Sequence, residues 1–166
     1  MFRSKVWITA LGIAGLMLLF SVQPANAGRK QIVVSLSKQH LWAYEGNRVM
    51  LETPVTTGRP QAPTPRGQYR VLAKYTPYLF RSPYPPGHSL YYSPLWSNYS
   101  LRITWRGHHL HDSPWRTAYG PGTNTARHRG ADGVVRAGSI GCVNIPPSVM
   151  DRLYSWADVG TLVRII

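Results

Sequence analysis

Ser139-Ile140-Gly141-Cys142-Val143-Asn144 is the stretch from which the fold and chemistry of this chain are best predicted, because it holds the only cysteine among 166 residues. A glycine before a nucleophile lets a substrate carbonyl approach the backbone and leaves the local N–H groups free to face it. A single cysteine excludes a disulfide framework and an all-cysteine zinc site. Two interpretations of Cys142 remain, a nucleophile or a small buried hydrophobe.

A nucleophilic cysteine needs a base, because only a few per cent of a free thiol is ionised at neutral pH. The chain offers six histidines for this role: His40, His88, His108, His109, His111 and His128. Sequence spacing does not choose among them. His111 ends a predicted strand beside Asp112. This aspartate could orient the imidazole by a hydrogen bond to the ring nitrogen that faces away from the cysteine. For the other five, a satisfied or surface histidine is the simpler interpretation.

Outward from this stretch the patterns predict a mainly β chain with few helices. A helix over 146–157 opens with prolines, carries Val149, Leu153, Trp156 and Ala157 on one face and is closed by Gly160. Strands are predicted over 32–36, 41–44, 49–55, 69–73, 101–105, 109–111 and 161–166. The first three form consecutive hairpins, and the third alternates so that Val49, Leu51, Thr53 and Val55 share a face.

A proline-rich aromatic segment interrupts this pattern between residues 76 and 100. Five prolines alternate there with seven tyrosine, phenylalanine or tryptophan residues, which is neither low complexity nor a repeat. Aromatic faces stack on sugars and apolar stems as well as on bases. The segment therefore indicates either a packed surface loop or the wall of a ligand site.

The N-terminus has the order of a Sec-type secretory signal peptide over residues 1–27. Arg3 and Lys5 precede an apolar run, and Ala25-Asn26-Ala27 supplies a small-residue cleavage site. The alternative is a retained membrane anchor, although the run is short for a span of about 20 residues. Cleavage leaves residues 28–166 as one domain and lowers the net charge from +13 to about +11. Export argues against nucleic acid as the basic chain's partner and favours an anionic cell-wall polymer.

The motifs also occur in the order of a known family. His111-Asp112-Ser113-Pro114-Trp115-Arg116, then Ser139-x-Gly141-Cys142-Val143-Asn144, then Pro146 and a short helix resemble the catalytic domain of bacterial L,D-transpeptidases. Upstream, the segment Pro54-Val55-Thr56-Thr57-Gly58 and the Thr64-Pro65-Arg66-Gly67 loop are also similar to that family. The resemblance runs from about Gln31 to Ile166. It implies a mainly β fold of sandwich-like or barrel-like mixed sheets, with one or two short helices.

The resemblance implies a cysteine acyl transfer that needs no cofactor and no metal. Cys142 attacks the third residue of a peptidoglycan stem peptide and expels the terminal D-alanine, with His111 as general base and acid. Backbone N–H groups of Gly141 and Cys142 hold the oxyanion, and Asp112 orients His111 through its carboxylate or its backbone carbonyl. Transfer to a stem amine gives a 3-to-3 crosslink. Ser139 and Asn144 shape the loop, and Asn144, Arg116 and Trp115 are expected to contact substrate. The protein is expected to be a monomer.

Two departures from the family pattern keep alternatives open. Ile140 stands where the family usually has histidine, and the 31 residues from His111 to Cys142 exceed the common spacing. If water accepts the acyl group, the protein is an L,D-carboxypeptidase. If Cys142 is inert, the protein is a module that binds the cell wall without reacting. His109, His111, Asp112 and His128 could form a metal site, but no H-E-x-x-H occurs. Ser35-Leu36-Ser37-Lys38 formally fits the S-x-x-K of penicillin-binding proteins, without the S-D-N or K-T-G that would accompany it.

Overall fold

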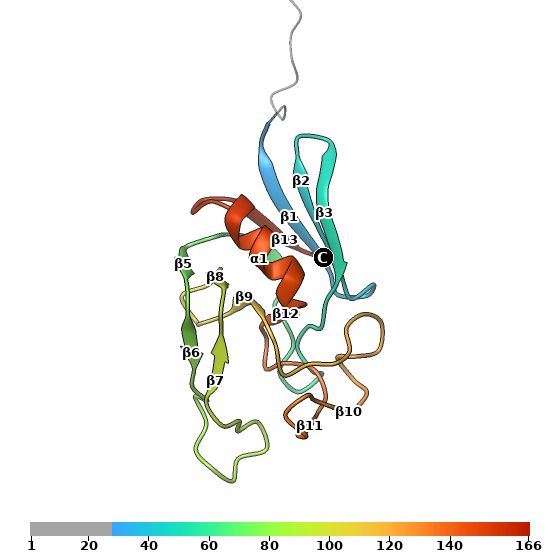
Figure 1. The fold of residues 1–166 in the computed structure, drawn as a ribbon, viewed down its shortest axis with the longest axis vertical. Coiled ribbons are helices and arrows are strands. Elements are labelled where there is room, and N and C mark those ends of the chain that lie inside the picture. Colours follow the sequence, from blue (N-terminus) through green and yellow to red (C-terminus); the bar gives the residue numbers. More distant parts are fainter. Residues whose placement is uncertain (1–27) are drawn as a thin grey trace, which may run out of the picture.

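The predicted N-terminal hairpins form part of a five-stranded sheet in the computed structural model, which describes residues 28–166 (Figure 1). The strands, in the order β3-β2-β1-β13-β4, are β3 (Arg48–Pro54), β2 (His40–Glu45), β1 (Lys30–Ser35), β13 (Leu162–Ile165) and β4 (Gly67–Arg70). Strand β13 runs parallel to β1, and the other neighbours are antiparallel. The last strand therefore lies beside the first. The predicted signal peptide, residues 1–27, lies outside the described residues.

A second, four-stranded sheet carries the segments with the motif residues. Its strands, in the order β12-β9-β8-β5, are β12 (Val143–Ile145), β9 (His109–Asp112), β8 (Ser100–Arg102) and β5 (Ala73–Tyr75). Two short ribbons pair β6 (Tyr78–Phe80) with β7 (Leu95–Ser97), and β10 (His128–Arg129) with β11 (Val135–Arg136). Strand β12 is parallel to β9, which makes this sheet mixed as well.

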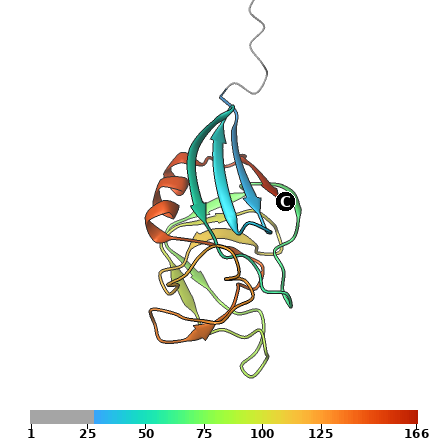
Figure 2. The same ribbon diagram turned by 90° about the vertical axis from the view of Figure 1, so that its right-hand side faces the viewer.

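One helix, α1 (Pro147–Trp156), packs where the two sheets meet (Figures 1 and 2). Leu153 of the helix is fully buried in one core with Ile32 of the first sheet and Leu110 and Ile145 of the second. Burying such side chains stabilises the fold by about 1.5–3 kcal/mol each. The expected mainly β fold of mixed sheets is confirmed, and residues 28–166 hold one short helix, within the expected one or two. Among the described residues no helix is long and apolar enough to cross a membrane.

The predicted strand 69–73 is wrong as a single element. Strand β4 ends at Arg70 and β5 begins at Ala73, and the two belong to different sheets. Between them, the N–H of Val71 donates to Thr161 (3.0 Å) and that of Leu72 to Arg102 (2.7 Å). The chain passes from one sheet to the other here. The alternation of apolar and polar residues therefore continues although the hydrogen-bonded neighbour strand changes.

Two predicted faces also differ from the structure. Val49 is 46% exposed, because a bulge in β3 sets Val49 opposite Tyr44 and Leu51 opposite Ala43, which breaks the alternation. On α1 the fully buried positions are Met150 and Leu153, whereas Trp156 is only half-buried. The helix also begins one residue later than predicted, at Pro147, after Pro146 as N-cap.

Candidate active site

Parallel pairing of β9 with β12 brings the two motif segments together. In this register Asn144 lies opposite His111. Cys142 precedes Asn144 by two residues, and alternate residues along an extended chain share a face. The thiol therefore lies on the side of the sheet that carries the imidazole, although 31 residues separate them in sequence.

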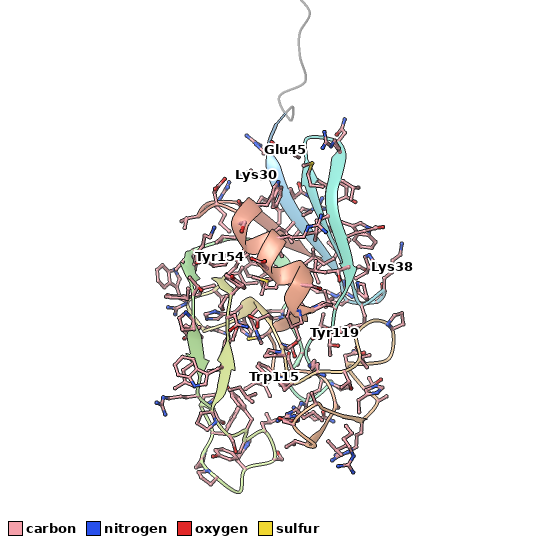
Figure 3. All side chains as sticks on the ribbon, in the orientation of Figure 1. Lys30, Lys38, Glu45, Trp115, Tyr119 and Tyr154 are labelled. Atoms are coloured by element: carbon pink, nitrogen blue, oxygen red, sulfur yellow. The ribbon has the colours of Figure 1, made fainter. Side chains whose placement is uncertain are left out.

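Cys142 and His111 line one cavity of about 70 Å³. Its walls come from the β6–β7 ribbon and its loop, from the crossover between β9 and β12, and from the loop after Gly58. The other lining residues are Arg59, Phe80, Tyr92, Leu95, Trp115, Arg116, Arg136, Gly138, Ser139, Ile140 and Asn144. Trp115, labelled in Figure 3, lies below the strands of the second sheet, with its ring 5.9 Å from that of His111.

Hydrogen bonds fix the tautomer of the buried His111 ring. Its Nδ1 lies 2.7 Å from the backbone carbonyl of Asp112, which only accepts, so Nδ1 carries the proton. Its Nε2 lies 2.9 Å from the amide nitrogen of Asn144, which only donates, so Nε2 presents a lone pair. Burial lowers the pKa of His111 to about 4, against the raising effect of the Asp112 carbonyl. The ring is thus a neutral base at neutral pH.

Arg116 fixes which way the Asn144 amide faces. Its Nε donates to Asn144 Oδ1 at 2.5 Å, and because a guanidinium only donates, the amide oxygen must face it. The amide nitrogen of Asn144 then faces His111. In the series from Arg116 through Asn144 to His111, each hydrogen-bond donor therefore meets an acceptor. Arg116 thus positions the imidazole indirectly, through the Asn144 amide.

The Cys142 thiol is half-buried and makes its own contact elsewhere. Its Sγ donates a weak bond to the carbonyl of Gly107, at 3.8 Å, in the turn between β8 and β9. Burial raises the pKa of Cys142 to about 11, against a lowering contribution from a backbone hydrogen bond with His109. With His111 uncharged, the resting site holds a neutral thiol and a neutral imidazole rather than an ion pair.

The glycine before the cysteine is required by both conformation and space. Gly141 has a φ of +109°, and a Cβ there would come within 2.7 Å of His108 Cδ2. Its N–H donates to Ser139 Oγ at 3.0 Å, and the Ser139 hydroxyl donates to the carbonyl of Cys142 at 2.5 Å. The N–H expected to face a substrate oxygen is therefore engaged by Ser139 in this structure, and Ser139 braces the loop.

Asp112 touches His111 only through its backbone. Its buried carboxylate instead accepts from Ser97 Oγ at 2.6 Å, from the N–H of Tyr99 at 2.7 Å and from the Asn98 amide at 3.3 Å. These bonds tie β9 to the turn between β7 and β8. The carboxylate thus holds the strand end whose carbonyl meets the imidazole.

Several cavity residues had no specific signal in the sequence. Phe80 and Tyr92 come from the aromatic segment, for which a ligand wall was one of the two interpretations, and their place in the cavity favours it. Burial, with Cys142 and Tyr78 nearby, raises the pKa of Tyr92 to about 12, so its hydroxyl stays protonated. Arg59 and Arg136 were missed, since no local pattern indicates that an arginine in a loop or a short ribbon faces a site.

The alternative metal site finds no support in the described part of the chain. No three His, Cys, Asp or Glu side chains among residues 28–166 are grouped to hold an ion. His109 is buried with Nδ1 bonded to Ser100 Oγ at 2.7 Å, and burial lowers its pKa to about 3.

Comparison with known proteins gives the same family from sequence and from structure. The family model of the L,D-transpeptidase catalytic domain matches residues 29–165. The crystal structure of a cysteine-to-serine mutant of the Enterococcus faecium L,D-transpeptidase is 33% identical, with a TM-score of 0.69 over 83% of this chain and 50% of that one. The solution structure of the E. faecium catalytic domain is 33% identical, with a TM-score of 0.65 over 84% and 98%.

A curated relative, L,D-transpeptidase 1 of Mycobacterium tuberculosis, is 25% identical over 137 residues, which are 81% of this chain and 49% of the relative. The chain thus spans about half the length of the curated relatives it matches. A family model that covers nearly all described residues is decisive for membership. The chain belongs to the L,D-transpeptidase catalytic domain family, a family of acyltransferases.

Proposed function

We propose that this protein is a peptidoglycan L,D-transpeptidase that uses Cys142 as nucleophile. The observation that carries the proposal is the shared cavity of Cys142 and His111, in which the imidazole is neutral and its unprotonated Nε2 accepts a hydrogen bond from the Asn144 amide. A neutral base can take the thiol proton as sulfur attacks, so no preformed thiolate is needed.

The reaction proceeds in two acyl transfers. Once the Asn144 amide has turned away from His111 Nε2, Cys142 Sγ bonds to the carbonyl carbon of the third stem residue while its proton passes to that nitrogen, and the peptide bond to D-alanine then breaks. His111 returns the proton to the leaving amine. An amine of a second stem then attacks the thioester, which forms the 3-to-3 crosslink and regenerates the thiol. The N–H of Cys142 holds the oxyanion, joined by that of Gly141 once Ser139 turns away.

The decisive experiment is acylation by a carbapenem, read by intact mass, beside crosslinking of purified tetrapeptide stems. We expect one adduct on the wild-type protein and none on Cys142→Ala. His111→Ala should acylate about 10²–10⁴-fold more slowly. Accumulation of tripeptide without dimer would instead identify an L,D-carboxypeptidase. Binding to sacculi with neither adduct nor product would contradict the enzyme and leave a wall-binding module.

The same proposal places the mature protein outside the cytoplasm as a monomer. The mature chain keeps 17 of the 19 Lys and Arg residues against 6 Asp and Glu, and this excess suits anionic cell-wall polymers rather than nucleic acid once the chain is exported. N-terminal sequencing of the protein recovered from the producing cell should begin at Gly28, whereas Met1 would contradict cleavage. Release from sacculi should increase steeply with salt, because the attraction is screened.

A further inference from the structure

Two arginines with no carboxylate partner stand in the cavity wall. Arg59 follows the bridge that pairs Gly58 with Ser139, and Arg116 lies in the crossover after β9. Both line the cavity that contains Cys142. We call this pair the cationic wall.

The hydrogen bonds of the cationic wall are made to neutral acceptors. Arg59 Nε donates to the carbonyls of Gly138 at 3.2 Å and Ser139 at 3.3 Å. Arg116 uses Nε for the amide oxygen of Asn144 and Nη2 for the carbonyl of Ala137, at 2.9 Å. Carbonyl and amide oxygens hold a guanidinium in place, but they do not neutralise its charge.

A third arginine in the cavity makes the contrast clear. Arg136 donates two bonds of 2.7 Å to Asp132, the bidentate pairing that guanidinium and carboxylate favour. Within residues 28–166 the ion pairs are this one, Lys30 with Asp158, and His40 with Glu52, so none involves the cationic wall. Asp132 is therefore already engaged, and the two wall charges remain uncompensated.

Uncompensated charges in a partly closed site are costly unless a ligand supplies the counter-charge. Burial, against a raising effect of Tyr119 and together with the nearby charges of Arg136 and Arg59, lowers the pKa of Arg116 to about 10. Even so, Arg116 is charged at neutral pH. A fold that keeps two such cations beside its nucleophile is complementary to an anion, and the planar fork of arginine matches a carboxylate.

We propose that the cationic wall binds a free carboxylate of the donor stem peptide, so that stems amidated at that carboxylate are poor substrates. This inference rests on the proposed function, because it deepens the substrate class of the same site. Two stem carboxylates lie within one residue of the scissile bond and are the candidates, that of the terminal D-alanine and, where the third residue is a diamino diacid, that on its side chain. The test below distinguishes them.

The test measures dissociation constants of three tetrapeptide stems with the Cys142→Ala protein, by calorimetry. One stem carries all its carboxylates free, one is amidated on the third side chain and one is amidated at the C-terminus. Amidation of the bound carboxylate should weaken binding about ten- to a hundredfold, and amidation of the other should change it less than threefold. This comparison keeps both arginines in place, so it does not depend on how a variant folds.

Variants then assign the effect to the wall. Arg59→Gln in the same background should reduce the discrimination to below threefold. Arg164→Gln is the matched control, because it removes one charge from the exposed side of β13 and should leave discrimination unchanged. Equal dissociation constants for all three stems would overturn the proposal. Discrimination that persists in Arg59→Gln would overturn the assignment to Arg59.

The outcomes separate this inference from the proposed function. Wild-type protein that forms 3-to-3 product equally from all stems would refute the cationic wall and leave the transpeptidase intact. Discrimination in binding without carbapenem adduct or product would leave the wall and refute the transpeptidase. Failure of every stem to bind would contradict both.

Discussion

Alkylation of Cys142 should follow the titration of a thiol without an ion-pair partner. The perturbation is pH, and the probe is iodoacetamide, which reacts with the thiolate. Burial raises the pKa of this thiol from 9.0 to about 11. At pH 7 that leaves about one thiol in 10⁴ ionised, against about one in 100 at the ordinary value. We therefore expect the folded protein to react about a hundredfold more slowly than the unfolded chain.

The histidine does not change this expectation, because its pKa of about 4 leaves it neutral across the range. Cysteine–histidine ion pairs behave differently, since the imidazolium lowers the thiol pKa far below 8. In this protein the alkylation rate should rise about tenfold per pH unit from pH 7 to pH 10. It should show no plateau in that range.

The assay is simple because the chain has one cysteine. Adducts are counted by intact mass, with urea-unfolded protein as the reference and Cys142→Ala as the blank. His111→Ala should keep the same alkylation profile while it loses acyl transfer. A plateau reached by pH 7, abolished in His111→Ala, would refute the reasoning and show a preformed thiolate–imidazolium pair.

Three further predictions follow from the same contacts. Asn144→Asp should place a carboxylate beside His111 and raise the pKa of the imidazole, so the acid limb of the carbapenem acylation rate should move to higher pH, while an unmoved limb would contradict the contact. Gly138→Ala would set a Cβ within 2.6–2.8 Å of backbone atoms of Thr57, Asn124 and Arg59. Urea denaturation should show a loss of about 2 kcal/mol or more, whereas Gly122→Ala, with open space around it, should cost only about 1–2 kcal/mol of backbone strain. Finally, burial keeps the pKa values of His109 and His111 at about 3 and about 4, below 6.5, so the unfolded chain binds more protons as pH falls through 6.5. The free energy of unfolding should then decrease by up to about 2.7 kcal/mol per pH unit between pH 6 and pH 4.5, and a flat profile there would contradict neutral buried imidazoles.

The sequence was sufficient for the elements whose partners are close in the chain. The hairpins of β1, β2 and β3 follow from alternation and turn residues. Where the partner changes, the pattern failed. Residues 69–73 alternate throughout, yet they divide between two sheets at Val71 and Leu72, because neither hydrogen-bond partner is near in sequence.

The candidate site divides in the same way. Cys142 and His111 were named from motif and chemistry, and the structure brings them to one cavity, while their roles stay predictions. The side chains of Arg116 and Asn144 were expected to contact substrate, which stays a prediction, and in the structure they hold His111 in place. Gly141 was expected to offer a free N–H, and Ser139 takes it.

The sequence by itself determined the mainly β class and the family, and it was enough to propose Cys142 and His111 as the reactive residues, because these inferences depend on local periodicity and on the order of short motifs. The tertiary structure decided the tautomer of His111, the neutral state of the thiol and imidazole, and the absence of a carboxylate beside Arg59 and Arg116 among the described residues. Each of these depends on burial and on partners supplied by other segments, chiefly through the parallel register of β9 and β12. A desolvated group takes its charge and its hydrogen bonds from what surrounds it in space, which neighbours in sequence do not specify.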